Sequence, residues 1–484
     1  MKSKISKILI ANRGEIALRI IRACKELEIT SVVIFAEADA EGSWIQTADE
    51  CYKIKGNPTE AYLDYANIIE VAKVLQCDAI HPGYGFLSES AEFAQACEEH
   101  GLIFIGPKAE HIALFGDKIA SKNIMREIGV PVIEGTEEPI TDIAEAASIA
   151  KEIGFPVIIK AAFGGGGRGM RIVHEEQEFK KMYEAANNEA IKYFGNGEMF
   201  VEKFIENPRH IEVQVIADKY GNVVHLGERD CSIQRRHQKV IEIAPSPHLS
   251  QSVRKELYRI AQKAMFKLGY ESVGTVEFLV DAQDKIYFIE MNTRVQVEHP
   301  VTEIISGVDI IQRMIQIAEG DPLHFLQEEI KFRGYAIEFR INAEDPHNNF
   351  MPSLGTIGKY LIPGGPGVRI DSSLYSGYTI PPYYDSMLGK LIVWALDWEG
   401  AVKKAKRALD EYYIEGVKTN LSLHREIVRD ASFIEATFDT SYLDGKLELL
   451  NQQAKNSEAR HKKRLSFLDK LLQRGLVTDK GDFL

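Results

Sequence analysis

The chain has 484 residues, of which 27% are charged and 45% hydrophobic, as in a soluble globular protein of about two to four domains. Acidic residues outnumber basic ones by 71 to 58, and the net charge of -13 argues against a basic surface for nucleic acids. No apolar run approaches the ~18 residues of a membrane span, and the five cysteines are scattered without a C-x-x-C pair. We therefore expect a cytoplasmic protein with no nucleic-acid partner and no membrane partner.

The N-terminal region alternates strand and helix patterns. Strand patterns at residues 7–11, 31–35 and 103–105 and near Ala79 alternate with helical patterns at residues 15–27, 62–75 and 91–100. This alternation predicts an α/β fold with a parallel, doubly wound sheet. Ligands bind such sheets at the carboxyl ends of strands, and the turn HPGYGF at residues 81–86 follows the strand near Ala79.

A glycine-rich segment follows a predicted helix at residues 143–153. Gly164, Gly166 and Gly169 match G-x-G-x-x-G, but the MRIV segment after them has a strand pattern, whereas a dinucleotide site needs a helix there. The segment therefore predicts a hairpin, which is either mobile without a ligand or a flap whose N–H groups cover phosphates. Lys160 before it and Arg168 within it are cationic and favour the flap.

Predicted strands at residues 274–280 and 285–289 precede a run of alternating polar residues. Glu290, Asn292, Arg294, Gln296 and Glu298 occur at every second position. We expect one extended strand with all five side chains on one face. Burying that face unpaired would cost several kcal/mol, so the face is either a solvated edge or a site. A site is favoured because the polar run directly follows a strand that is predicted to be buried.

Candidate metal ligands lie on the same two strands. Antiparallel pairing would place Glu277 opposite Glu290, and with the Asn292 amide oxygen they form the hard oxygen set that suits Mg²⁺. A pair of exposed strand acids is the alternative. Further residues fit ATP, although each alone is commonly an ordinary solvated or hydrogen-bonded side chain: Glu202 and Lys203 for adenine, Lys118 for phosphate, and His210 and Gln234 for ribose or phosphate.

A third region, residues 333–450, has strand patterns at residues 336–341 and 388–394. The charged segment after it carries a leucine stripe at Leu465, Leu468 and Leu472. That stripe indicates either a solvated helix or a helix that docks on a partner protein.

Several motifs occur in one order along the chain. They are HPGYGFLSE (residues 81–89), FIGP (104–107), GDK (116–118), the glycine hairpin, ERDCSIQRRHQKVIE (228–242), EMNTRVQVEHPVTE (290–303), RINAEDP (340–346) and PPYYDSMLGKLI (381–392). Together they closely resemble biotin carboxylase, a member of the ATP-grasp superfamily, over residues 7–447. The implied fold is α/β, with a doubly wound N-terminal domain (1–115), an ATP-grasp domain (116–325) whose glycine-hairpin lid spans 131–205, a β-rich C-terminal domain (333–447) and an extension (448–484).

The resemblance also implies residue roles. ATP would be bound by Lys118, Lys160, Gly165, Gly166, Met170, Glu202, Lys203, Ile205, His210, Gln234, His237, Leu279 and Ile289. Two Mg²⁺ or Mn²⁺ ions would be held by Glu277, Glu290 and Asn292. Bicarbonate would be surrounded by Lys239, Arg294, Gln296, Val297 and Glu298, and biotin would be contacted by Tyr84 and Arg340.

The implied reaction is the ATP-dependent carboxylation of biotin by bicarbonate through carboxyphosphate, with Lys239, Arg294, Glu298 and Arg340 as catalytic residues. The Arg294 guanidinium matches a carboxylate-like anion two bonds at a time, and Glu298 would take the bicarbonate proton. Arg340 would stabilise the enolate-like oxygen of biotin. The glycine hairpin would exclude water, because carboxyphosphate hydrolyses readily.

The resemblance is to stand-alone subunits of the acetyl-CoA carboxylase or two-subunit pyruvate carboxylase type. The chain has no A-M-K-M-like biotinylation site, so we expect a homodimer that works with a separate biotin carboxyl carrier protein and a carboxyltransferase subunit. The final acceptor stays open among pyruvate, acetyl-CoA, 2-oxoglutarate and other acyl-CoAs. Two alternatives are another ATP-grasp ligase, of the carboxylate–amine or carbamoyl-phosphate kind, and a non-catalytic nucleotide-binding regulatory subunit.

Overall fold

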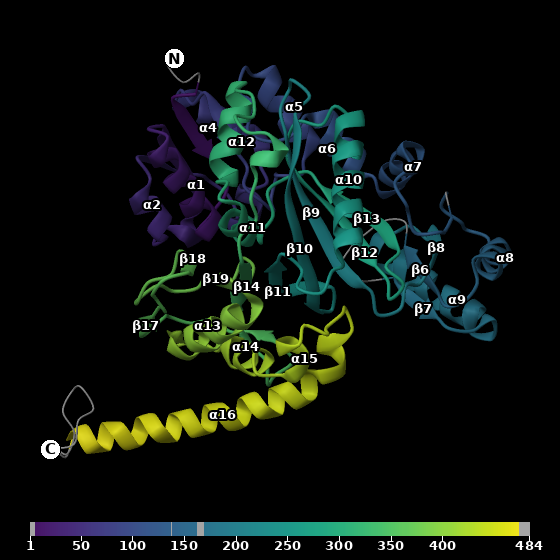
Figure 1. The fold of residues 1–484 in the computed structure, drawn as a ribbon. Coiled ribbons are helices and arrows are strands. Elements are labelled where there is room, and N and C mark those ends of the chain that lie inside the picture. Colours follow the sequence, from purple (N-terminus) through teal and green to yellow (C-terminus); the bar gives the residue numbers. More distant parts are fainter. Residues whose placement is uncertain (1–4, 137, 162–168, 474–484) are drawn as a thin grey trace.

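The structure is a computed structural model that describes residues 5–136, 138–161 and 169–473. Figure 1 shows the N-terminal sheet and its helices beside a long central sheet, with a small lid region to one side and a long helix at the C-terminal end. None of the helices in these ranges combines the length and the apolar character that a membrane crossing requires.

The N-terminal part is a doubly wound sheet, as predicted. Five parallel strands lie in the order β3-β2-β1-β4-β5. Their bounds are β1 Lys7–Ile10, β2 Thr30–Phe35, β3 Glu50–Lys53, β4 Ala79–His81 and β5 Ile103–Phe104, and the helices around them are α1 Gly14–Glu26, α2 Ser43–Thr47, α3 Pro58–Ala61, α4 Tyr65–Val74, α5 Ala91–Glu99 and α6 Ala109–Gly116. One predicted helix begins late: α4 starts at Tyr65 rather than residue 62, because the Asp64 side chain caps it by accepting from the Asn67 N–H.

The order of the strands reverses between β1 and β4, so a crevice opens at their carboxyl ends. The loops that follow these two strands lie side by side there. The Asn12 side chain, after β1, donates to the carbonyls of Pro82 (2.7 Å) and Tyr84 (2.8 Å), after β4. The crevice therefore brings Tyr84 next to the start of α1.

The lid region has its own small sheet and core. Helix α7 (Lys118–Ile128) leads into α8 (Ile143–Ile153), and strands β6 (Val157–Ala161), β7 (Arg171–Val173) and β8 (Met199–Lys203) pair in the order β7-β6-β8, with α9 (Glu176–Phe194) packed against them. The predicted hairpin is confirmed, because β6 and β7 are antiparallel with Val157 opposite Val173. Gly164, Gly165, Gly166 and Arg168 lie outside the described residues.

An eight-stranded sheet forms the centre of the molecule, in the order β13-β12-β9-β10-β11-β14-β19-β18. Its strands are β9 Arg209–Ala217, β10 Val223–Arg235, β11 Gln238–Ala244, β12 Ser272–Val280, β13 Ile286–Asn292, β14 Tyr335–Asn342, β18 Val368–Ser372 and β19 Met387–Ala395. Helices α10 (Gln251–Lys267), α11 (His299–Ser306) and α12 (Ile310–Glu319) pack against it. The sheet runs from the second region of the sequence into the third, because β11 pairs with β14.

Two features of this sheet differ from the prediction. Strand β10 extends far beyond residues 223–226, and β11 was not predicted. Both carry charged residues that are fully buried, such as Glu228, Arg229 and Glu242. Hydrophobic periodicity misses such strands, because their inward positions are polar and paired rather than apolar.

The C-terminal part covers the end of the sheet with helices α13 (Trp398–Glu411), α14 (Leu421–Ile427) and α15 (Ala431–Ile434), and adds short strands β15 Glu344–Asp345, β16 Met351–Pro352, β17 Tyr360–Leu361 and β20 Tyr413–Ile414. Helix α16 (Tyr442–Gln473) packs through Leu443, Leu450 and Ala454, which are fully buried. Beyond them it continues away from the body of the molecule (Figure 1). The side chains of the leucine stripe lie outside those the structure describes.

Candidate active site

A cavity of about 1250 Å³ lies where the N-terminal sheet, the lid and the central sheet meet. Most of the predicted site residues line it: Tyr84, Lys160, Met170, Lys203, Ile205, His210, Gln234, His237, Lys239, Glu277, Leu279, Ile289, Glu290, Asn292, Arg294, Gln296, Val297, Glu298 and Arg340. Lys118 and Glu202 do not line it. Lys118 is exposed at the start of α7, and Glu202 is buried in β8. Gly165 and Gly166 are outside the described residues.

The two candidate metal acids face each other, as predicted. Strands β12 and β13 are antiparallel, and Glu277 is directly opposite Glu290. Asn292 donates its amide N–H to Glu277 Oε1 (2.8 Å). Burial and the negative charge of Glu277 raise the pKa of Glu290. The two carboxylates and the amide oxygen fit a divalent cation, because they are hard oxygen donors whose mutual repulsion such an ion would relieve.

The polar run after Glu290 is not one strand, which corrects our prediction. The ladder with β12 ends at the pair Thr275–Asn292, and α11 begins at His299. Val295 turns into the apolar core, and Pro300 lies in the first turn of α11, where its missing N–H would interrupt a strand ladder. The five polar residues of the run line the cavity all the same.

Lys239 occupies the centre of a group of carboxylates. Its ammonium lies 3.0 Å from Glu277 and 2.7 Å from Glu298, and it also contacts Glu212. Burial alone would lower the pKa of Lys239, but these three negative charges raise it well above its ordinary value. The ammonium is therefore held in its charged form, between the candidate metal acid Glu277 and Glu298.

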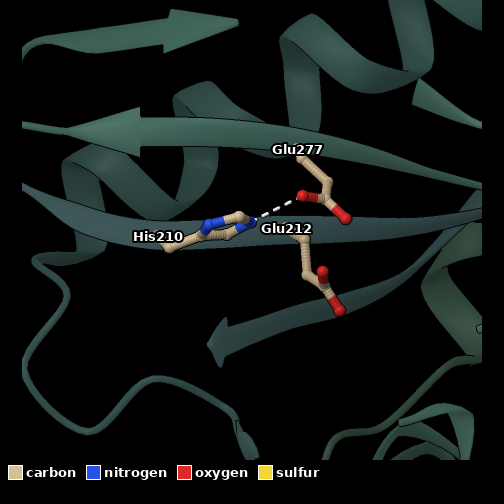
Figure 2. Close-up of side chains that lie close together, drawn as sticks. All are labelled: His210, Glu212 and Glu277. Carbon is tan, nitrogen blue, oxygen red and sulfur yellow. Dashed lines mark hydrogen bonds and ion pairs between the residues drawn. The ribbon is translucent and has the colours of Figure 1, made fainter. Parts of the chain in front are cut away.

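Figure 2 shows Glu212 and Glu277 with His210, and His210 Nε2 lies 2.6 Å from Glu277 Oε2. These three side chains come from β9 and β12, which are neighbours in the central sheet. His210 and Glu277 were predicted, whereas Glu212 was not. A signal was present, because His210, Glu212 and Gln214 alternate with Ile211 and Val213 and so mark a polar face within an apolar strand.

Glu298 is an ionised carboxylate between two cations. Besides Lys239, it accepts a hydrogen bond of 3.0 Å from Arg340 Nη2. Burial would raise the pKa of Glu298, but the charges of Lys239 and Arg340 hold it far below its usual range. Glu298 is thus available to accept a proton at neutral pH.

Arg340, on β14, is held at both ends. Its guanidinium pairs with Glu242 of β11 at 2.5 Å, and its carbonyl accepts from the Asn420 amide at 2.9 Å. Burial raises the pKa of Glu242 to about 7, although the positive charge of Arg340 acts to lower it. Sequence analysis missed Glu242, although it lies inside the motif that ends at residue 242.

Tyr84 connects the crevice of the N-terminal sheet to the same site. Its hydroxyl donates to Glu15, at the start of α1. Glu15 pairs with Lys390 of β19 at 3.0 Å, and Lys390 donates to the Val297 carbonyl at 2.9 Å. All three regions of the chain therefore meet at the buried ammonium of Lys390, which sequence analysis also missed.

The lid also contributes cations to the cavity. Lys160 lies 2.6 Å from Glu202, which also pairs with Lys122. Burial would raise the pKa of Glu202, but these two lysines lower it to about 2. Lys203 donates to the carbonyls of Gly154 (2.9 Å) and Phe155 (3.1 Å). The lid thus brings two lysines, Lys160 and Lys203, to the cavity wall.

Three family models match the chain. The biotin carboxylase N-terminal domain matches residues 4–112, the ATP-binding domain of the carbamoyl-phosphate synthase L chain matches residues 117–326, and the biotin carboxylase C-terminal domain matches residues 338–445.

Curated relatives are similar over most of the chain. The 2-oxoglutarate carboxylase small subunit of Hydrogenobacter thermophilus is 53% identical over 90% of this chain and 93% of its own length. A biotin carboxylase of Nostoc is 51% identical over 91% and 99%, and a pyruvate carboxylase subunit of Methanothermobacter thermautotrophicus is 51% identical over 91% and 89%.

A solved structure has the same fold. It is the biotin carboxylase domain dimer of the Hydrogenobacter thermophilus 2-oxoglutarate carboxylase, in complex with MgADP, ADP and bicarbonate. It superposes with a TM-score of 0.88 at 52% identity, over 92% of this chain and 98% of that chain.

Proposed function

The chain belongs to the biotin carboxylase family and is an ATP-dependent ligase that carboxylates biotin, and we propose that its central cavity holds nucleotide, bicarbonate and biotin next to one another. The observation that carries this proposal is the position of Lys239, whose ammonium contacts Glu277 on the metal side and Glu298 on the other. One cation thus joins the two halves of the site, so that bicarbonate is held beside the phosphate it attacks.

We assign the lid side of the cavity to the nucleotide. ATP is bound by the cations and polar groups Lys160, Lys203, His210, Gln234 and His237 and by the apolar Met170, Ile205, Leu279 and Ile289. Lys118, Glu202, Gly165 and Gly166 complete the proposed set. Closure of the lid region (131–205) would bring Glu202 and the two glycines to the nucleotide, whereas Lys118 lies outside the lid, at the start of α7. Glu277, Glu290 and Asn292 hold Mg²⁺ or Mn²⁺, and the bound ions would neutralise phosphate charge.

Bicarbonate is proposed to bind among Lys239, Arg294, Gln296, the Val297 backbone and Glu298. The Arg294 guanidinium now bonds Glu89 (2.9 Å) and the Asn292 amide oxygen (2.7 Å), and the anion would take over these donors. Glu298 is the proposed base. Its pKa is held low by Lys239 and Arg340, and an anion bound beside it would oppose its charge and raise that pKa toward the working pH.

Biotin is proposed to bind where Tyr84 and Arg340 meet the cavity, beside the bicarbonate residues. Carboxyphosphate formed there would break down to CO₂ and phosphate, and phosphate would remove the ureido N–H proton. The Arg340 guanidinium would then stabilise the resulting oxyanion, because it is charged and fixed by Glu242 before the reaction begins.

Another ATP-grasp ligase would share the nucleotide and metal residues. However, the carbamoyl-phosphate synthase model matches only residues 117–326, while the regions on both sides match biotin carboxylase. Tyr84 and Arg340 come from those flanking regions. A non-catalytic role is also disfavoured, because the cavity retains every charged residue assigned to bicarbonate and biotin.

The partners are proposed from the relatives. Two of them are named as subunits of carboxylases whose acceptors, 2-oxoglutarate and pyruvate, are 2-oxo acids. We propose that this chain is a cytoplasmic homodimer that supplies carboxybiotin, on a separate carrier protein, to a carboxyltransferase that uses a 2-oxo acid. We retain the domain limits 1–115, 116–325, 333–447 and 448–484 in this proposal.

The projecting part of α16 is a proposed docking helix for that partner. The C-terminal family model ends at residue 445, before this part of the helix begins. Its sequence is basic in an acidic chain: residues 455–473 hold six basic residues and two acidic ones, the six being Lys455, Arg460, Lys462, Lys463, Arg464 and Lys470. This charge favours an acidic surface on the partner.

The activity is tested by measuring ADP release from ATP with bicarbonate and free biotin together, and with each left out. Release that depends on bicarbonate and rises with biotin is the expected result. Release that is unaffected by both would overturn the proposal, because ATP would then be used for another reaction.

A further inference from the structure

Arg229 is a buried cation behind the proposed bicarbonate residues. It lies in β10 opposite Glu212 of β9, its side chain is 0% exposed, and it does not line the cavity. A guanidinium has five N–H donors, and here each has an acceptor: Nε donates to Glu212, Nη1 to Gln214 Oε1 (2.8 Å) and Thr302 Oγ1 (2.9 Å), and Nη2 to Thr275 Oγ1 (3.1 Å) and Gln296 Oε1. Arg229 is thus saturated by the protein.

The contact with Gln296 fixes which way its amide points. A guanidinium only donates, so the amide atom that faces Arg229 must be the oxygen. The NH₂ group therefore points the opposite way, where it donates to Glu277 Oε1 at 2.7 Å. Gln296 is 2% exposed and lines the cavity, so the orientation of its amide decides whether the cavity meets donors or an acceptor.

An anion such as bicarbonate needs donors at this position. If the Gln296 amide turned over, its oxygen would face Glu277 and the incoming anion, and both contacts would be repulsive. Glu212, held by the same guanidinium, is also the third carboxylate around Lys239. One buried side chain therefore orients Gln296 directly and Lys239 through Glu212, and both of these residues line the cavity.

We propose that Arg229 is a positioning residue for bicarbonate, acting through the Gln296 amide and the Glu212 carboxylate. This inference rests on the proposed function, because it takes Gln296 and Lys239 as bicarbonate residues. It assigns no contact between Arg229 and a substrate. The expected signature is a change in bicarbonate binding that is not shared by ATP.

A purely structural role would also follow from the burial of Arg229, since its removal takes one of two cationic partners from the buried Glu212 and leaves only Lys239 beside it. The test therefore uses Arg229→Lys, which keeps the charge but offers three donors instead of five. The matched control is Arg254→Lys. Arg254, on α10, pairs at 2.7 Å with Glu228, which is on β10 next to Arg229. Like Arg229, it does not line the cavity. Both variants therefore replace a guanidinium that is bound to a buried carboxylate.

The experiment measures KM for bicarbonate and for ATP in the full-length protein, with free biotin as acceptor. Arg229→Lys is expected to raise the bicarbonate KM by about tenfold or more and the ATP KM by less than about threefold, and Arg254→Lys is expected to change neither beyond about threefold. Equal changes in both KM values for Arg229→Lys, or the same bicarbonate effect from Arg254→Lys, would overturn the proposal.

A double-mutant cycle separates this inference from the proposed function. Gln296→Ala should raise the bicarbonate KM, and adding Arg229→Lys to it should raise that KM by less than about threefold more. If the two effects multiply in full, Arg229 does not act through Gln296, and the inference fails while the bicarbonate site stands. If Gln296→Ala leaves the bicarbonate KM unchanged, the bicarbonate assignment of Gln296 is itself wrong, and the inference fails with it.

Discussion

The ammonium of Lys239 lies 2.7 Å from the carboxylate of Glu298, and the same ammonium reaches Glu277 at 3.0 Å. The proposed general base and one of the proposed metal acids, Glu277, are therefore held by one cation. A proton taken from bicarbonate by Glu298 would leave the nucleophile within reach of the phosphate that the metal ions bind.

Glu298→Gln should lower bicarbonate-dependent ADP release by about a hundredfold or more, because an amide cannot take the bicarbonate proton. The KM for ATP should stay within about threefold of wild type. Steady-state ADP release measures both quantities, with Glu399→Gln, an exposed acid on α13, as the control. Turnover near the wild-type rate would remove Glu298 as the base.

Arg340→Ala should lower biotin carboxylation by about a hundredfold or more, because the enolate-like oxygen loses its cation. The KM values for ATP and bicarbonate should change far less. Carboxybiotin formation at saturating bicarbonate is the measurement, and Arg254→Ala is the control away from the cavity. If carboxylation survives within about tenfold of wild type, the oxyanion role is wrong.

Glu290→Gln should raise the Mg²⁺ concentration needed for half-maximal activity by about tenfold or more, because a metal ligand loses its charge. Without metal, the same variant should unfold at a slightly higher temperature than wild type. The reason is that burial and the charge of Glu277 disfavour the ionised form of Glu290. Mg²⁺ titration and thermal unfolding check the two halves, and an unchanged Mg²⁺ requirement would contradict the assignment.

Glu202 should make the lid sensitive to acid. Its folded pKa of about 2 is below the ordinary 4.5, so its stabilising contribution is present above pH 4.5 and is lost as the pH falls toward 2. That contribution is on the order of 3 kcal/mol. Glu202→Gln should therefore lose less stability than wild type between about pH 5 and 3. Thermal unfolding across that range is the measurement, and parallel curves for the two proteins would refute the pairing.

Deleting residues 463–484 should weaken the complex with the carboxyltransferase partner but leave biotin-dependent ADP release unchanged. The reason is that the residues through which α16 packs on the body of the protein, Leu443, Leu450 and Ala454, remain in place. Size-exclusion chromatography of the native complex measures assembly, and ADP release of the isolated protein is the control. A complex that forms as well as before rules out docking by this helix.

Much of the fold follows from local patterns in the sequence. The alternation of strands and helices before residue 105 predicts the doubly wound sheet, because the spacing of apolar residues in each segment indicates which of its faces is buried. Strands β10 and β11 escape this logic, since Arg229 and Glu242 are buried by pairing across strands. Such partners come together only in the assembled sheet, so no local sequence pattern predicts them.

The site residues also divide into those that a local pattern predicts and those that only contacts in the folded structure reveal. Glu277 and Glu290 could be placed opposite each other, because a short turn joins their strands. The alternation from Glu290 to Glu298 was misinterpreted as one strand, since period two cannot report where a ladder ends. Residues such as Arg229 and Lys390 lie inside the motifs at residues 228–242 and 381–392, but nothing in those motifs distinguishes them from their neighbours, and only their contacts reveal their roles.

The central claim is that bicarbonate attacks the γ-phosphate of ATP in this cavity. It is tested most directly by carrying out the reaction with ¹⁸O-labelled bicarbonate and analysing the released phosphate by mass spectrometry. Attack through a bicarbonate oxygen, followed by breakdown of carboxyphosphate, would leave one labelled oxygen in each phosphate. Phosphate that carries no label above the water background would contradict the account.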